Sequence, residues 1–421
     1  MILIPCLFFS FLTLYWWRKH ECFDICVYMS ALYALTSILA IIIVLAELLG
    51  EGGILFDNGN LKLGVAPTLL YCGLIASSLL PFSMIYGKDI KKITINAPLA
   101  IDILSWTLIV LSFLNLYLVA DSTLDILQGD LAKVRSDANA GVDSPAALKA
   151  ETLPFIIKVF YYLNASTLLC IPIFFYNICF RSKPWWFNGL LVFASLCMPI
   201  VGIQQADRTE IVFYGLMLLF CLIFFYRYLS KKNKILLLAL GSPIVLASVV
   251  YLVAVSQARF DDKRSSDSGD RAIQYAGQGY LNFCYFYEYG KFDYITTERE
   301  FPLINYVFKK QASNNDRRDE RAGEQGFFIS VFASFLGDIM LDISPLGLII
   351  WVLSYFIIMM LFIRRSHREE YDLSEIIFIF LMAVIPIFGI FYYRFFYFTN
   401  TLTLLIVIGL LLISKYKLVL K

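Results

Sequence analysis

The feature that constrains this chain most is its series of long apolar runs, such as ICVYMSALYALTSILAIIIVLAELLG at 25–50. A helix of about 20 apolar residues crosses the hydrocarbon core of a bilayer, where every backbone polar group must be paired internally. Hydrophobic residues form 59% of the sequence and the mean hydropathy is +0.72, far above the range of soluble domains. We therefore expect an all-α polytopic membrane protein with about eleven transmembrane helices. The expected spans are 2–17, 25–49, 65–87, 97–120, 153–180, 185–205, 209–228, 235–256, 344–363, 376–393 and 395–414.

The distribution of lysine and arginine predicts the orientation of these helices. With the N-terminus outside, the inner connections and the C-terminal tail hold 17 Lys or Arg, whereas the short outer connections hold only Lys62, Arg208 and Arg394. Cytoplasmic loops of membrane proteins carry such an excess of positive charge. The first run, MILIPCLFFSFLTLYWWRKH, has its basic cluster after its apolar residues, so we interpret it as a membrane helix and not as a signal peptide. The sequence thus predicts an N-terminus outside and a C-terminus in the cytoplasm.

Three regions follow from this topology. Residues 1–256 hold the first eight helices and an outer loop at 121–152, and residues 257–326 form a large extracytoplasmic loop. The start of that loop, 257–272, is polar enough to be mobile, and the following AIQYAGQGYLNFCYFYEYG is expected to form an amphipathic helix at the membrane surface. Residues 327–421 hold the last three helices.

The apolar stretch that follows the large loop is too long for one crossing. Residues 327–363 are 37 residues, roughly 55 Å if helical. We expect a break near Gly337–Asp338 or Ser344–Pro345, with a short re-entrant helix before the true span.

Charged residues within and beside the spans are the candidate functional residues, because an ionisable group in a membrane helix is costly. Several are expected near the outer leaflet, and the large loop adds further arginines and aromatic residues. The candidates are Lys158, Arg208, Glu210, Arg259, Arg264, Arg271, Tyr280, Asp338 and Arg394. Structural interpretations compete: Arg208 pairs with Asp207 or Glu210, Lys158 snorkels, and Arg394 is an interfacial anchor among tyrosines. However, if each cation were only a separate structural anchor, these cations would not be expected to gather near the outer leaflet, because most Lys and Arg lie on the inner side.

A basic site at the outer leaflet suits a phosphate-bearing lipid. The planar guanidinium of arginine binds phosphate oxygens through two parallel hydrogen bonds, and a low dielectric strengthens the contact. A polyprenyl diphosphate presents its headgroup at this depth, with its tail between helices. If the diphosphate is a leaving group, fixed cations also stabilise the charge that develops in the transition state.

The pattern resembles the oligosaccharide repeat-unit polymerases, the O-antigen or Wzy-type polymerases. The likeness covers nearly the whole chain: the number of spans, the late outer loop, the arginine after QQAD and the segment FLGDIMLDISPLG after the loop. An arginine followed by glycine eleven positions later, as in some members, is absent, since Arg208, Arg264 and Arg271 are followed there by Leu219, Tyr275 and Asn282.

The resemblance implies a metal-independent, GT-C-like glycosyltransferase in the bacterial inner membrane, with no cofactor. It would join undecaprenyl-diphosphate-linked oligosaccharides into surface polysaccharide at the outer face. Arg208, Glu210 and Arg394 would be catalytic, and Lys158, Arg259, Arg264, Arg271, Tyr280 and Asp338 would bind substrate. The lipid bilayer is an expected partner and nucleic acid is not; a chain-length regulator is kept open as a partner.

Other function classes remain open. An O-antigen ligase shares the architecture but is expected to use a histidine in its outer loop, and the only histidines here, His20 and His367, are placed inside. The same absence counts against membrane-bound O-acyltransferases. A lipid-linked oligosaccharide flippase would line its midplane with charge. A general base, if needed, would be Glu210, Asp207 or Asp338. His20 with Cys22 and Cys26 lacks a fourth metal ligand, and the Asp261–Asp262 pair is interpreted as part of a solvated loop.

Overall fold

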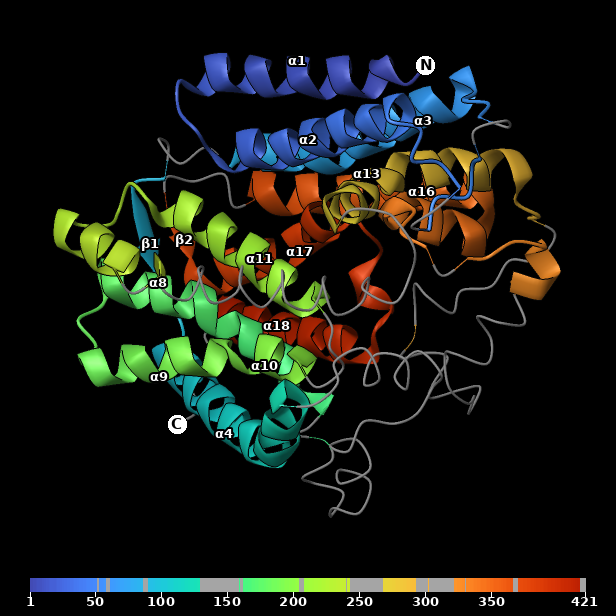
Figure 1. The fold of residues 1–421 in the computed structure, drawn as a ribbon. Helices are drawn as coiled ribbons and strands as arrows, with labels where there is room; N and C mark the ends of the chain where they lie inside the picture. Colours follow the sequence, from blue (N-terminus) through green and yellow to red (C-terminus); the bar gives the residue numbers. More distant parts are fainter. Residues whose placement is uncertain are drawn as a thin grey trace. The chain divides into compact units, whose positions relative to one another are not determined.

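The computed structural model describes most of the predicted membrane domain as helices (Figure 1). The described residues are 1–50, 53–57, 61–85, 90–128, 159, 162–203, 208–239, 241–242, 268–292, 302, 322–329, 331–365 and 370–416. Among them, six helices are long and apolar enough to cross a membrane, which supports an all-α membrane protein. These are Ile25–Leu45, Val65–Met84, Pro98–Ala120, Trp185–Ile203, Ser334–Arg364 and Phe398–Tyr416.

The predicted count of about eleven spans extends beyond these six helices. Three further apolar helices are shorter: Asn164–Phe180, Thr209–Phe225 and Leu373–Phe388. The first predicted span forms α1 (Leu3–His20), which ends in Arg18, Lys19 and His20. Most of the predicted span 235–256 lies outside the described residues. The full count and the GT-C-like arrangement stay predictions.

The chain divides into two compact units. Unit 1 comprises Met1–Lys91, Asp267–Glu370 and Met382–Thr401, and unit 2 comprises Lys92–Ser266, Tyr371–Leu381 and Leu402–Lys421. Each unit is therefore assembled from segments far apart in sequence.

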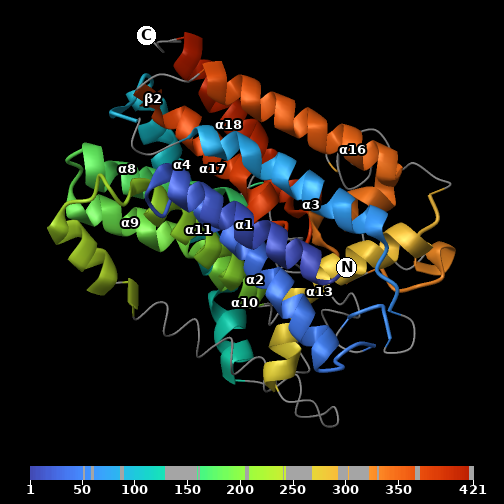
Figure 2. The ribbon, with the colours of Figure 1, turned by 90° about the horizontal axis from the view of Figure 1, so that it is seen from above.

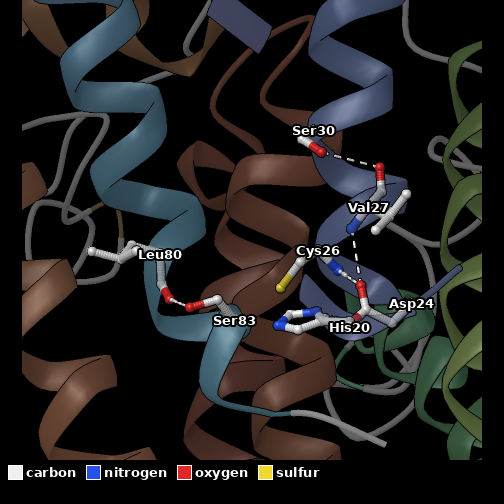
Figure 3. Close-up of polar contacts among 7 residues, drawn as sticks. All are labelled: His20, Asp24, Cys26, Val27, Ser30, Leu80 and Ser83. Carbon is white, nitrogen blue, oxygen red and sulfur yellow. Dashed lines mark hydrogen bonds and ion pairs between the residues drawn. The ribbon is translucent and has the colours of Figure 1, made fainter. Parts of the chain in front are cut away.

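Unit 1 begins with a hairpin in which α1 packs along α2 (Ile25–Leu45) (Figure 1). Asp24 is the N-cap of α2, and its Oδ1 accepts hydrogen bonds from the backbone N–H groups of Cys26 and Val27, each at 3.0 Å. Its Oδ2 lies 2.5 Å from Nδ1 of His20, the last residue of α1 (Figure 3). One buried carboxylate thus caps α2 and fastens the end of α1 to it.

The helix α13 (Ser268–Tyr289) packs against α2, α3 (Val65–Leu79) and α16 (Ser334–Arg365) in unit 1. The sequence correctly predicts a helix here, but the amide side chains of Gln274, Gln278 and Asn282 are buried instead of facing solvent. Gln274 donates to the carbonyl of Leu48 at 3.0 Å, and Asn282 donates to the carbonyl of Gly53 at 2.9 Å. These amides pair with backbone groups that a connecting segment would otherwise leave unsatisfied.

Two glycines allow α13 to approach its neighbours closely. A Cβ at Gly277 would lie 2.8 Å from the backbone nitrogen of Ala40 in α2. A Cβ at Gly279 would lie 2.7 Å from the carbonyl oxygen of Ile390. The sequence AGQGY therefore places backbone contacts on two sides of the same helical turn.

The long helix α16 lies beside α3, and its break is at Ser344 (Figure 2). Ser344 has φ 71° and ψ 167°, and Pro345 follows it. The predicted break at Ser344–Pro345 is confirmed, since proline disfavours helical backbone at the preceding residue. Whether the short first half enters the membrane from outside stays a prediction.

Unit 2 contains a second group of helices and a two-stranded sheet. Its elements are β1 (Lys92–Thr94), α4 (Pro98–Gln128), η2 (Asn164–Leu169), α8 (Cys170–Phe180), α9 (Trp185–Ser195), α10 (Cys197–Ile203), α11 (Thr209–Phe225) and β2 (Glu370–Asp372), with parts of α17 (Leu373–Phe388) and α18 (Phe398–Tyr416). β1 pairs with β2. The α8–α9 hairpin packs through α8 on α11 and through α9 on α4.

One carboxylate holds several of these elements together. Asp372 accepts hydrogen bonds from the N–H of Asn96 at 2.7 Å and from the hydroxyl of Ser414 at 2.7 Å. Its own N–H donates to Glu375 at 3.0 Å, as in a helix capping box. Asp372 therefore starts α17 and ties it to the end of α18.

Candidate functional site

The candidate site is built around Arg394, in the segment between α17 and α18. α17 ends at Phe388, α18 begins at Phe398, and Arg394 starts the short helix η3 (Arg394–Phe396). The sequence predicts spans at 376–393 and 395–414, with almost no loop between them. The structure corrects this boundary, because the nine residues 389–397 lie between α17 and α18. Although arginine is rarely buried, Arg394 is only 4% exposed.

Three hydrogen bonds fasten this segment to the first turn of α16. The N–H groups of Ser334 and Phe335 donate to the carbonyls of Phe391 at 3.0 Å and of Gly389 at 2.9 Å. The N–H of Tyr393 donates to Oδ2 of Asp338 at 2.8 Å. The start of a helix has N–H groups without helical partners, and here backbone carbonyls satisfy two of them. The residue before Arg394 is thus fixed by α16.

The peptide of Arg394 is held from its other side as well. Its carbonyl accepts from Nδ2 of Asn400 at 3.1 Å and from the N–H of Tyr397 at 3.3 Å. Asn400 lies in the first turn of α18. Contacts from α16 and α18 therefore hold the backbone of Arg394 in one position.

Aromatic rings surround the guanidinium. Nη1 of Arg394 donates to the hydroxyl of Tyr392 at 2.8 Å, and its Cζ lies 5.0 Å from the ring centre of Tyr397 and 5.5 Å from that of Phe388. A cation–π contact of this kind stabilises a desolvated cation by about 2 kcal/mol. The rings thus offset part of the cost of burying the charge and keep the guanidinium plane oriented.

A chain of half-buried rings extends from Tyr392 to α13. Phe332 is stacked on Tyr392, with ring centres 6.0 Å apart and an interplanar angle of 20°, and Tyr275 lies 5.6 Å from Phe332. Arg271 lies one helical turn before Tyr275 and is partly exposed. The buried guanidinium of Arg394 is therefore followed by the rings of Tyr392, Phe332 and Tyr275, and Arg271 lies one turn before Tyr275 on the same helix.

Two predicted substrate-binding residues, Arg271 and Asp338, lie on the elements that build this site, and their contact with substrate stays a prediction. Arg271 lies at the edge of the aromatic chain. Asp338 uses a carboxylate oxygen to hold Tyr393, so the structure gives it a positioning role.

Tyr280 packs on α3, and its predicted contact with substrate stays a prediction. Its hydroxyl lies 2.7 Å from Oγ1 of Thr68 in α3. Thr68 donates its one hydroxyl proton to the carbonyl of Gly64, so Tyr280 is the donor. Tyr280 is buried, and burial raises the pKa of its phenol. We assign Tyr280 to the packing of α13 on α3.

Arg208 and Glu210 lie in unit 2. Arg208 is the residue before α11, as the sequence predicts, and Glu210 is in its first turn, where a negative charge is favourable. Both are partly exposed. Because Arg208 and Arg394 belong to different units, their convergence on one ligand stays a prediction. Lys158, Arg259 and Arg264 lie outside the described residues, as do Asp207 and the Asp261–Asp262 pair.

Phe332, Tyr275 and Ser334 are parts of the site that the sequence did not predict. Ser334 has φ 61°, unusual for a residue other than glycine, and its buried hydroxyl has no hydrogen-bond partner among the described residues. No local pattern marks these residues, because they meet Tyr392 and Phe391 only through the packing of α13 and α16. The dense aromatic run FYYRFFYF around Arg394 was the available signal.

Comparison of the chain with protein-family models, with curated proteins and with solved structures found no match.

Proposed function

We propose that this membrane protein is a glycosyltransferase that polymerises oligosaccharide repeat units carried on undecaprenyl diphosphate. The observation that supports it best is the buried Arg394, fixed through Asp338 and α16 and enclosed by aromatic rings, in a chain rich in apolar helices. A guanidinium held in this way suits a diphosphate at the edge of a bilayer. The resemblance to repeat-unit polymerases agrees with this chemistry.

In the proposed reaction, the acceptor hydroxyl attacks the anomeric carbon of the donor sugar. The bond from that carbon to the diphosphate oxygen breaks, the new glycosidic bond forms, and undecaprenyl diphosphate leaves. Arg394 stabilises the negative charge that grows on the leaving oxygen, and Arg208 stays a second candidate cation from the sequence. A carboxylate takes the hydroxyl proton, and the partly exposed Glu210 in the first turn of α11 is the proposed base. Tyr397, 39% exposed over the guanidinium, is the ring that moves when the headgroup enters.

The experiment is complementation of a deletion strain, with surface polysaccharide read on a gel. Loss of this gene should leave glycans carrying a single repeat unit, and the wild-type gene should restore the ladder. Arg394→Ala should fail to restore it while the protein is inserted at wild-type amounts, and Arg394→Lys should restore it only in part, because lysine lacks the planar fork. Long polymer that is not attached would indicate a ligase instead.

A lipid-linked oligosaccharide transporter is the second candidate, favoured by one observation in unit 2. Asn177 in α8 is 3% exposed, and neither its amide nitrogen nor its oxygen has a hydrogen-bond partner among the described residues. An unsatisfied buried amide costs about 1–3 kcal/mol unless water or a ligand pairs with it. Loss of all surface glycan on deletion, with no single-unit product, would favour this function over the polymerase.

A further inference from the structure

A cluster of charged residues lies at one end of α4 and α9 in unit 2, and the proposed reaction does not use it. Arg181 donates to both oxygens of Asp102, with Nη1–Oδ1 and Nη2–Oδ2 distances of 2.6 and 2.8 Å. Nζ of Lys183 donates to Oδ2 of the same carboxylate at 3.1 Å. Two cations share one anion, so the cluster carries a net positive charge.

Aromatic rings stand beside these charges. Trp106, one turn after Asp102, lies 6.2 Å from Trp186 and 5.3 Å from Phe187, measured between ring centres. Nζ of Lys183 lies 5.4 Å from the ring centre of Phe187. Trp106 and Trp186 are nearly half exposed, and the neighbouring Trp185 is 85% exposed. The cations and the exposed indoles therefore form one continuous surface.

The ends of two candidate spans indicate where this surface meets the bilayer. It lies at the N-terminal ends of two candidate spans, Pro98–Ala120 and Trp185–Ile203. These helices run in parallel, since Trp106 meets Phe187 and, farther along, Phe113 meets Phe193 at 5.2 Å. Exposed tryptophans are typical of the membrane–water interface, where lipid headgroups lie.

We propose that Arg181, Lys183, Trp106 and Trp186 form a binding site for an anionic glycerophospholipid. The guanidinium of Arg181 has five N–H donors, and two of them bind Asp102. The ammonium of Lys183 has three N–H donors, and one of them binds Asp102. The remaining donors bind the headgroup phosphate through charge-assisted hydrogen bonds. Asp102 holds both cations in place before the lipid arrives, and the indole rings cover the glycerol and the first methylenes of the acyl chains.

The test is native mass spectrometry of the full-length protein, released from detergent with equal amounts of phosphatidylglycerol and phosphatidylcholine. The wild type should retain phosphatidylglycerol in preference to phosphatidylcholine. Lys183→Gln should lower the retained phosphatidylglycerol about fivefold. Lys183→Arg should restore it, since the charge and the donors return. Lys232→Gln, which removes an exposed lysine outside the Asp102 cluster, is the matched control and should retain the wild-type amount.

Three results would overturn the proposal. Equal retention of the two lipids by the wild type would show that the headgroup charge is not recognised. An equal loss in Lys183→Gln and Lys232→Gln would indicate a general charge effect and no site. Displacement of the lipid by millimolar inorganic phosphate would assign the cluster to a free anion. Equal melting temperatures of the variants exclude misfolding as the cause of a loss.

Discussion

The carboxylate of Asp338 and the backbone amide of Tyr393, 55 positions apart in the sequence, are joined by a hydrogen bond of 2.8 Å. This bond fixes the residue directly before Arg394 to the first half of α16. The position of the buried guanidinium therefore depends on a helix that precedes it by more than fifty residues.

Asp338→Ala is expected to destabilise this segment. The substitution leaves the buried N–H of Tyr393 without its acceptor, which costs about 1–3 kcal/mol. Asp338→Asn retains a carbonyl oxygen and should lose less. Thermal unfolding in detergent gives the stability, and the polysaccharide ladder gives the activity. Equal melting temperatures for wild type and Asp338→Ala would show that the bond does not hold the segment.

Gly279→Ala should disturb the same segment from α13. Its Cβ would lie 2.7 Å from the carbonyl oxygen of Ile390, a backbone atom that cannot rotate away. We expect a lower melting temperature, with a loss of about 1–3 kcal/mol from the forced displacement. The matched control is Gly73→Ala in α3, where a Cβ meets nothing within 4 Å and helix propensity improves. A control that loses as much stability as Gly279→Ala would contradict the close approach.

How much the sequence predicts differs from residue to residue. The break at Ser344–Pro345 follows from length and local chemistry, because 37 apolar residues exceed one crossing and proline interrupts a helix. The burial of Gln274 and Asn282 could not be predicted in this way. Their polar pattern is typical of a solvent-facing surface, and their partners at Leu48 and Gly53 come from a distant segment.

The candidate site shows the same limit. The cost of charge near hydrocarbon singles out Arg394 from the sequence, but its aromatic enclosure depends on Phe332 and on tertiary packing. Tyr280 was selected by type, and only the structure shows its hydroxyl bound to Thr68.

The thiol of Cys284 in α13 should resist alkylation in the folded protein. Cys284 is fully buried, and burial raises its pKa to about 12. At pH 8 the thiolate fraction is then on the order of 10⁻⁴, and the thiolate is the reactive form. In a variant whose single cysteine is Cys284, a water-soluble maleimide should react with the thiol only after the protein is denatured. Rapid labelling of the folded variant would place α13 in contact with water along this face.

The same thiol predicts a direction for stability against pH. Its folded pKa lies above the unfolded value of about 8.5, so the folded state holds a proton that the unfolded chain releases. The contribution of Cys284 to stability is therefore complete below about pH 8.5 and falls as the pH rises toward 12. Cys284→Ser should show a flatter decline over this window in thermal unfolding. An identical decline in both proteins would contradict the shift.

Asp24→Ala should weaken the α1–α2 hairpin. It removes the N-cap of α2 and the partner of His20, and loss of an N-cap alone costs about 0.5–2 kcal/mol. Asp24→Asn retains the capping oxygen and should recover that part of the stability. The free energy of unfolding in detergent distinguishes the two variants. If Asp24→Asn is as unstable as Asp24→Ala, the pairing with His20 and not the cap dominates.

The proposed binding of a polyprenyl diphosphate by Arg394 is measured with undecaprenyl diphosphate and the purified protein. Microscale thermophoresis of wild type, Arg394→Lys and Arg394→Ala gives three dissociation constants. We expect an affinity at least about tenfold weaker for Arg394→Ala, an intermediate value for Arg394→Lys, and unchanged binding of undecaprenol, which lacks phosphate. Equal affinity of wild type and a folded Arg394→Ala for the diphosphate lipid would contradict it.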